Sequence, residues 1–165
     1  MLPLIYRHLN ISAEQITVIA PCDIDEELCK QYPFKFKKLE ITKENYIDVL
    51  SKELSKGDFL LNLSVNVSSL DLIKFIRDKG VNYLDTCIEP WSGGYTDATL
   101  SPSDRSNYAL RESVINLKKE YKNEGPSALV AHGANPGLVS HFVKQALSNI
   151  AKDTKTKVKT PSNKQ

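Results

Sequence analysis

Apolar residues follow two alternating patterns along the chain. Compact apolar runs with β-branched residues are typical of buried strands, and such runs occupy residues 16–20, 59–65, 81–86 and 127–131. Residues 34–39 alternate between apolar and polar positions, which is typical of an edge strand. Between them, apolar positions recur every three or four residues, as on one face of a helix. The run at 59–65 gives the strongest strand signal and is expected to be a central strand. The alternation favours βαβ units around a parallel sheet.

The helical segments carry start and stop signals. Helices are expected at residues 2–9, 42–55, 69–79, 101–121 and 138–151. Ser68 or Ser69 is suited to cap the third of them, and Ser101 or Asp104 the fourth. Gly80 is suited to end the third. Together the elements predict an α/β fold: a Rossmann-like, doubly wound and mostly parallel sheet.

Ligands of such sheets bind beyond the carboxyl ends of the strands. The residues that follow the expected strands are therefore the first candidates for function. The polar ones are Asp23, Asn66, Glu89 and Asn135.

Composition narrows the class of protein. The length of 165 residues, with 41% hydrophobic and 25% charged residues, fits one globular domain over residues 1–150. No apolar run approaches the roughly 18 residues that span a bilayer, and no signal peptide is evident. The three cysteines, Cys22, Cys29 and Cys87, lack the spacing of a zinc site and are expected to be free thiols of a cytoplasmic protein.

Residues 151–165 form a lysine-rich tail. They carry five lysines and one aspartate, a net of +4, so the other 150 residues carry −2 of the total of +2. With a single aliphatic residue the tail cannot offset its ordering entropy, and we expect it to be disordered. A basic tail could contact nucleic acid. The absence of aromatic residues favours a solvated end instead.

Six segments of the chain, in order, resemble homospermidine synthase, a family related to saccharopine dehydrogenase. They are residues 2–5, 57–65, 83–91, 93–97, 105–111 and 132–147. The last of them contains the run His-Gly-Ala-Asn-Pro-Gly that opens the final expected helix. The resemblance extends from residue 2 to about residue 151, and the family continues well beyond that point.

The resemblance implies NAD as a cofactor that is recycled within one reaction. In the family, putrescine is oxidised to an imine by bound NAD, a second amine displaces ammonia, and the new imine is reduced to homospermidine. It also implies putrescine or a related diamine as a ligand, and a homodimer.

Two parts that this chemistry requires do not occur in the sequence. A dinucleotide fold begins with a strand and a G-x-G-x-x-G turn, which holds the pyrophosphate at a helix N-terminus, and no such motif occurs here. The family's C-terminal catalytic region is also missing. Without the first strand, the strands at 16–20 and 59–65 should each have one unpaired edge. Two explanations for the missing first strand remain open. One is a decayed and truncated gene, and the other is a start placed downstream of the true one.

Eight residues are expected to contact NAD. They are Asp23, Asn62, Ser64, Val65, Thr86, Cys87, Asn135 and Pro136. Asp23 follows the strand whose acidic residue holds the ribose in dinucleotide folds, with a surface turn as the alternative. Asn62 is either an NAD contact or a buried amide satisfied by its neighbours. Asn135 is implied to contact the nicotinamide and is also suited to cap a helix.

Asn66, Glu89 and Trp91 are expected to bind the amine substrate. A carboxylate beside an aromatic ring suits an ammonium group, and the alternative is a solvated loop glutamate. The family carries an aspartate where this chain has Asn66, and a neutral amide attracts a diammonium ion less strongly. No residue is assigned a catalytic role. Cys87 has no neighbouring basic group in the sequence to activate it as a nucleophile.

We interpret the chain as a truncated, inactive relative of homospermidine synthase. The alternatives are a non-catalytic NAD-binding or assembly module and, less favoured, a nucleic-acid accessory acting through its tail.

Overall fold

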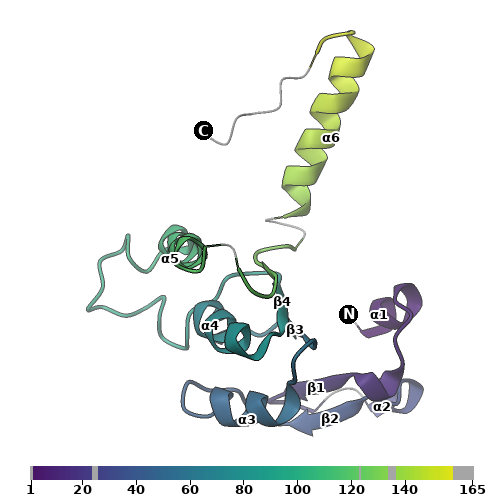
Figure 1. Cartoon of the computed structure of the whole chain (residues 1–165), viewed down its shortest axis with the longest axis vertical. Helices are drawn as coiled ribbons and strands as arrows, with labels where there is room; N and C mark the ends of the chain where they lie inside the picture. The colour runs from purple at the N-terminus through teal and green to yellow at the C-terminus, as the bar shows by residue number, and fades with distance from the viewer. Residues whose placement is uncertain (1, 24–25, 123, 134–136, 158–165) are drawn as a thin grey trace. The chain divides into compact units, whose positions relative to one another are not determined.

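The computed structural model describes residues 2–23, 26–122, 124–133 and 137–157. The chain divides into two compact units, residues 1–54 and 55–165 (Figure 1). The single domain expected from the length stays a prediction.

The first unit is a βαβ unit flanked by helices. Its elements are α1 (Leu2–His8), the 3-10 turn η1 (Ala13–Gln15), β1 (Thr17–Ala20), α2 (Glu26–Gln31), β2 (Lys35–Lys38) and α3 (Tyr46–Glu53). β1 and β2 are parallel, with Thr17 opposite Lys35 and Ala20 opposite Lys38. The rings of Tyr6 and Tyr32 stack at 4.7 Å. Both expected strands and the helix at 2–9 are confirmed. The sequence pattern missed α2, a short helix with few apolar residues.

The helix expected at residues 42–55, α3, begins later than residue 42. The side chain of Asn45 accepts a hydrogen bond from the Thr42 amide at 2.8 Å and donates one to the Glu40 carbonyl at 2.8 Å. An asparagine that bonds the backbone locally in this way competes with helix formation. Residues 43–45 therefore form a turn, and α3 starts at Tyr46.

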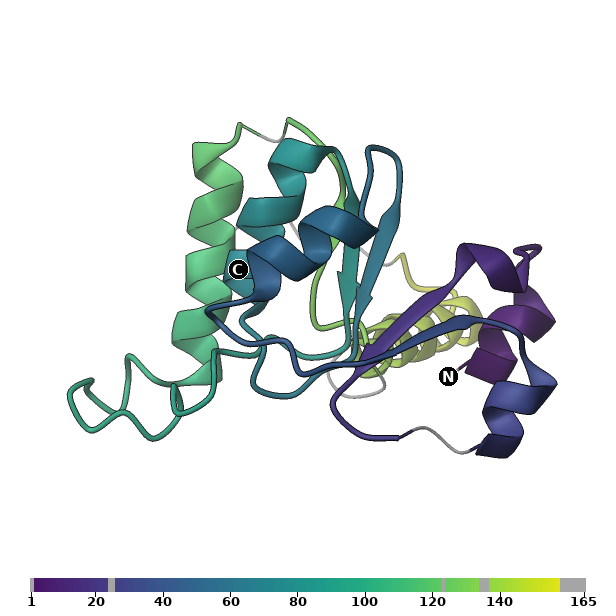
Figure 2. The same ribbon diagram turned by 90° about the horizontal axis from the view of Figure 1, so that it is seen from below.

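The second unit is a three-stranded parallel sheet covered by helices. Its elements are β3 (Phe59–Asn62), α4 (Ser69–Lys79), β4 (Asn82–Asp85), α5 (Asn107–Glu120), β5 (Ala128–Leu129) and α6 (Leu138–Asp153). The strand order is β3-β4-β5. α4 and α5 lie side by side on one face of the sheet (Figure 2).

The core of the second unit centres on α4 and β4. Leu72, Ile73 and Ile76 of α4 pack inward, as the sequence pattern predicts, and Ile76 is 1% exposed. The Ser68 hydroxyl accepts from the Asp71 amide and caps α4. Gly80 ends the helix in the left-handed conformation, at φ 71°.

The expected central place of the strand at 59–65 is wrong for this sheet. β3 ends at Asn62 and lies at the edge of the sheet, and β4 is its centre. The Asn62 side chain accepts from the Ser64 amide at 3.1 Å, which turns the chain out of the strand. Within the described residues β1 pairs with β2 alone and β3 with β4 alone. The unpaired strand edges expected at 16–20 and 59–65 are therefore present.

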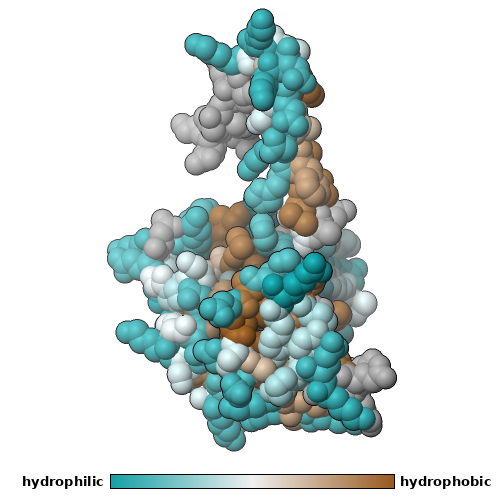
Figure 3. Space-filling model, turned by 90° about the vertical axis from the view of Figure 1, so that its right-hand side faces the viewer, coloured by the Kyte–Doolittle hydropathy of each residue, from teal (hydrophilic) through white to brown (hydrophobic). Residues whose placement is uncertain are grey.

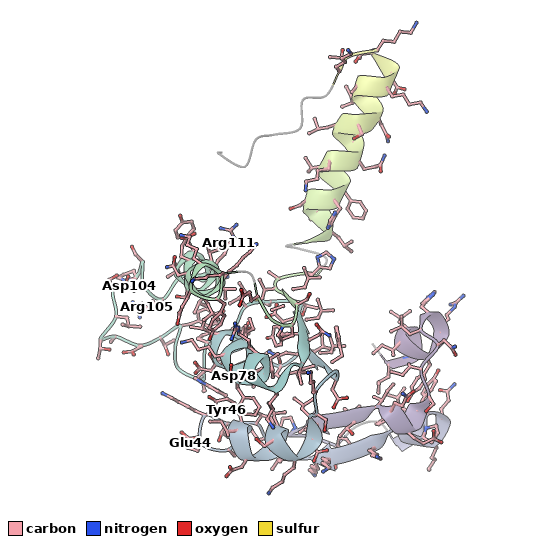
Figure 4. All side chains as sticks on the ribbon, in the orientation of Figure 1. Glu44, Tyr46, Asp78, Asp104, Arg105 and Arg111 are labelled. Atoms are coloured by element: carbon pink, nitrogen blue, oxygen red, sulfur yellow. The ribbon has the colours of Figure 1, made fainter. Side chains whose placement is uncertain are left out.

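The helix expected at residues 101–121 starts six residues later, at Asn107 rather than at residue 101. Residues 102–105 form turns, and α5 begins at Asn107 (Figure 4 labels Asp104 and Arg105 before it and Arg111 within it). Ser106, rather than Ser101 or Asp104, is the cap, since its hydroxyl accepts from the Ala109 amide at 3.2 Å. At the other end of the unit, α6 continues to Asp153, past the expected end at residue 151. The disorder of the whole tail stays a prediction.

Ser106→Ala is expected to lower the free energy of unfolding of the second unit by about 1 kcal/mol, the usual contribution of a serine N-cap. Ser101→Ala is the matched control, because the sequence marks Ser101 as a cap and the structure places it outside the helix. Urea denaturation of both variants measures the difference. Equal effects would mean that α5 starts at the earlier serine in solution.

No described helix is long and apolar enough to cross a bilayer. Among the described residues, no group of three or more histidine, cysteine, aspartate or glutamate side chains could hold a metal ion.

Candidate functional site

The three strands of the second unit are parallel, so their carboxyl ends meet at one edge of the sheet. Three segments leave this edge. With the last residue of each of the first two strands included, they are residues 62–66 at the end of β3, 85–91 at the end of β4 and 130–133 after β5. Most residues that the sequence marks as candidates lie in these segments, and the structure therefore brings them to one edge.

A buried polar network ties these strand ends together. The Asn62 amide donates to the Tyr83 hydroxyl at 3.0 Å, and the Tyr83 hydroxyl donates to Asp85 Oδ2 at 2.9 Å. Asp85 Oδ1 accepts from the Ala131 amide at 2.6 Å, and the Asp85 carbonyl accepts from the His132 amide at 3.1 Å. Asp85 is fully buried and Tyr83 is 1% exposed. One carboxylate thus fixes the chain after β5 against β3 and β4.

Burial dominates the electrostatics of this network. Desolvation raises the pKa of Asp85, although the Ala131 amide and the Ser69 and Tyr83 hydroxyls oppose the shift. Desolvation also raises the pKa of Tyr83, and the adjacent carboxylate contributes. Tyr83 is therefore a fixed hydrogen-bond donor to Asp85, and the network is suited to positioning the strand ends rather than to proton transfer.

Glu89 is anchored through its backbone while one carboxylate oxygen stays unsatisfied. The Ser69 amide donates to the Glu89 carbonyl at 2.9 Å, and the Glu89 amide donates to the Ser69 hydroxyl at 3.1 Å. Glu89 Oε2 is buried and has no hydrogen-bond partner in the described part of the chain. Buried carboxylate oxygens are normally paired, so this one is suited to accept from a ligand cation.

The charge of Glu89 contributes to the raised pKa values of two neighbouring groups, Cys87 and Tyr95. The pKa of Cys87 is raised, first by burial and then by the hydrogen bond to and charge of Glu89. A protonated thiol is a poor nucleophile, and that Cys87 has no catalytic role stays a prediction. Burial and the Glu89 charge also raise the pKa of Tyr95. The Tyr95 hydroxyl lies 3.2 Å from the Ile88 carbonyl and 3.1 Å from Asn107 Oδ1.

Of the two other residues expected to bind the amine, Trp91 is fixed by a hydrogen bond and Asn66 is exposed. The Trp91 indole donates to Asp71 Oδ2 at 2.6 Å, which fixes the half-buried ring against α4. Asn66 is exposed in the left-handed conformation, at φ 64°. Val65 is 72% exposed, and Ser64 is exposed beside it, while Thr86 is half-buried. The segment after β3 is thus open to a ligand.

The described residues on either side of the turn between β5 and α6 have unusual backbone angles and bond to one another. Ala131 adopts a left-handed φ of 52°, and Gly137 a φ of 111°. The Leu138 amide donates to the Gly133 carbonyl at 2.9 Å, and the rings of His132 and His141 meet edge to face at 5.4 Å. The expected NAD contacts Asn135 and Pro136 lie outside the described residues.

Asp23 belongs to the first unit. Its carboxylate is 79% exposed and lies 2.7 Å from the ammonium of Lys38, at the end of β2. An ion pair this exposed contributes little to stability, and both groups are accessible to a ligand.

The sequence does not predict the network itself. It places Tyr83 and Asp85 in an expected strand and gives neither a functional role. Their signal is the spacing, because two polar residues at i and i+2 of an apolar strand lie on the same face of the sheet. Ser69, which is fully buried beneath Glu89, was considered only as a helix cap.

A hollow at the opposite edge of the second unit is a separate feature. Its lining includes Lys56, Arg77, Gly80 and Asn82, at the amino ends of β3 and β4. The side chain of Arg77 lies over the ring of Tyr121, 3.8 Å from its centre. No residue expected to bind NAD or amine lines this hollow.

Comparison with known proteins identifies the family to which this chain belongs. Residues 1–129 match the sequence profile described as the saccharopine dehydrogenase NADP binding domain. The chain belongs to this family. The resemblance predicted from the sequence is therefore confirmed, and so is the Rossmann-like α/β fold.

Two homospermidine synthases are similar to this member of the saccharopine dehydrogenase family. That of Blastochloris viridis is 44% identical and that of Mesorhizobium japonicum 43% identical, each over 155 residues, 92% of this chain. The crystal structure of homospermidine synthase from Legionella pneumophila in complex with NAD matches 97% of this chain, with a TM-score of 0.82 and 40% identity. The chain spans about a third of the length of these relatives, 32% in each case.

Proposed function

We propose that this chain is the nucleotide-binding portion of a homospermidine synthase-like protein and that it binds NAD at the carboxyl ends of its strands. The observation that carries the proposal is the buried Asn62–Tyr83–Asp85 network. It aligns three strand ends at the edge where dinucleotide folds bind their cofactor. The similarity to a relative crystallised with NAD supports the choice of NAD.

The residues at this edge of the second unit fit a dinucleotide. In the first unit, the exposed Asp23 carboxylate is by itself suited to accept hydrogen bonds from ribose hydroxyls. Ser64 and Val65 offer accessible backbone after β3, and Thr86 and Cys87 follow β4. We assign Asn62, Asn135 and Pro136 to the same site on the strength of the resemblance.

We further propose that the associated reaction is the transfer of an aminobutyl group between diamines such as putrescine. Bound NAD would supply the hydride acceptor and donor. Glu89 would hold an ammonium group through its unsatisfied oxygen, next to Trp91, and Asn66 would orient it. The chain alone is proposed not to catalyse this reaction, because the relatives are about three times as long. Formation of homospermidine by the purified chain with NAD and putrescine would overturn that proposal.

Asp23→Ala is expected to weaken NAD binding about tenfold, since a hydrogen bond to a charged group contributes about 1.5–3 kcal/mol. Asp48→Ala is the matched control, because Asp48 is also an exposed aspartate of the first unit. Calorimetric titration of the full chain with NAD measures both. Absence of binding heat from the unaltered chain at high protein concentration would refute the NAD site.

Glu89→Gln is expected to weaken putrescine binding at least about tenfold, because the amide removes the charge that pairs with the ammonium. Glu124→Gln is the control for a change in net charge, since Glu124 is exposed and distant in sequence. An NMR titration of the full chain with putrescine, in the presence of NAD, reports both affinities. Equal affinities in the two variants would assign Glu89 to a structural role.

A second candidate function is a non-catalytic assembly module. The observation that favours it is α6, whose large apolar side chains are all exposed.

A further inference from the structure

The helix α6 presents an uncovered apolar surface. Its large hydrophobic side chains are 43–66% exposed, and none of its residues is buried. These residues are Leu138, Val139, Phe142, Val143, Leu147 and Ile150, which we call the α6 face. Figure 3 shows apolar and polar side chains on opposite sides of this helix. An apolar patch of this extent on a helix marks an interaction surface.

The width of the α6 face indicates what kind of surface covers it. At 3.6 residues per turn, its members span roughly 180° of the helix circumference, from Leu138 to Leu147. Ser140, Lys144 and Ser148 lie on the other half. A two-stranded coiled coil uses a narrower seam of two positions per heptad. The α6 face therefore fits a groove of a globular body better than a second single helix.

The relatives contain further polypeptide that can form such a globular body. The crystallised homospermidine synthase matches 97% of this chain but is matched over only 32% of its own length, and the sequence relatives show the same proportion. The matched part is the N-terminal third of these proteins. In them, the counterpart of α6 is thus followed by about twice as much polypeptide as this chain contains.

We propose that the α6 face is the docking surface for the polypeptide that forms the remaining two thirds of homospermidine synthases. The docked polypeptide covers Phe142 and its apolar neighbours and leaves the Lys144 side of the helix in water. The proposal rests on family membership and on the α6 face. It does not require NAD to bind, so a failed NAD titration leaves it standing.

Hydrogen exchange of α6 tests the proposal. The full chain is compared with a chimera in which it replaces the matched third of the Blastochloris viridis homospermidine synthase. We expect amides of residues 138–153 to exchange at least about tenfold more slowly in the chimera, since burial adds to the free energy of local opening. Equal exchange in the two proteins would overturn the proposal.

Variants of the α6 face separate docking from helix stability. Phe142→Ser and Ile150→Ser are expected to leave the melting temperature of the chain by itself unchanged and to lower that of the chimera. Lys144→Ser, on the polar side, is the matched control and is expected to change neither. Equal effects of Phe142→Ser and Lys144→Ser on the chimera would count against the α6 face.

Two further outcomes are informative. If the chimera is insoluble, the chain is co-expressed with the remaining two thirds as a separate polypeptide. Recovery of a soluble complex that Phe142→Ser abolishes supports the proposal, and failure in both formats contradicts it. A dimer of the chain alone that Phe142→Ser dissociates, seen by light scattering, would assign the face to a second copy instead.

Discussion

Replacing Asp85 with alanine is expected to lower the free energy of unfolding of the second unit by about 3 kcal/mol. The change leaves the buried Tyr83 hydroxyl and the half-buried Ala131 amide without their acceptor, and an unsatisfied buried group costs about 1–3 kcal/mol. Urea denaturation measures the loss. Asp85→Asn is the milder control, because an amide oxygen can still accept from Ala131. An Asp85→Ala variant as stable as the Asn variant would show that the network is not formed in solution.

The same carboxyl gives the second unit a distinctive pH dependence. Burial raises the pKa of Asp85, so the folded chain binds this proton more tightly than the unfolded chain. Its protonation therefore favours folding fully below the unfolded-state pKa of about 3.9, and the contribution is lost as the pH rises through the folded-state pKa. Asp97 of the same unit, whose pKa is lowered, acts in the opposite direction, and Glu44, whose pKa is also lowered, does so in the first unit.

The Asp85→Asn variant isolates this effect, because the other carboxyls titrate equally in both proteins. We expect the unaltered chain to gain stability relative to the variant as the pH falls from about 8 to about 4. A difference in stability that stays constant over this range would mean that Asp85 has its ordinary pKa.

Gly137→Ala is expected to open the turn between β5 and α6. An alanine Cβ would lie 2.6 Å from the Gly133 carbonyl oxygen and 2.9 Å from its nitrogen, in a backbone conformation with φ 111°. We expect a local cost of about 3 kcal/mol, which raises the exchange rate of the Leu138 amide about 100-fold. NMR-detected hydrogen exchange reads this amide directly.

Gly93→Ala is the matched control for Gly137→Ala. Gly93 also has a positive φ, 84°, but a Cβ there would meet nothing within 4 Å. Its cost should be limited to about 1 kcal/mol of backbone strain, with no change at Leu138. If both variants left the Leu138 exchange rate unchanged, the contact between Gly133 and Gly137 would be dispensable.

Elements whose signals are local could be predicted from the sequence. α4 begins after Ser68 and ends at Gly80 because a serine hydroxyl caps the first turn and glycine adopts the left-handed conformation. The strands β1 and β4 lie in compact apolar runs, and β2 lies in an alternating run. These local patterns also predict the strands. The start of α5 could not be predicted, because Ser101 also bonds locally, to Asp104 at 2.7 Å, and imitates a cap.

The candidate site depends on longer-range pairing. The position of the site at the carboxyl ends of the strands was predicted, because parallel strands bring these ends to one edge whatever the side chains are. The role of Asp85 could not be predicted, since its hydrogen bond to Ala131 joins residues 46 positions apart. The residues expected to contact NAD and amine remain predictions for the titrations above.

The indole of Trp91, held by Asp71, makes the second unit separately visible in solution. Trp91 is the only tryptophan of the chain, and the stacked Tyr6 and Tyr32 belong to the first unit. Fluorescence excited in tryptophan alone therefore reports on residues 55–165, and the part of the near-ultraviolet dichroism that is lost in a Tyr32→Leu variant reports on the tyrosine stack of residues 1–54. A single denaturation series followed with both signals shows whether the two units melt in one transition or in two.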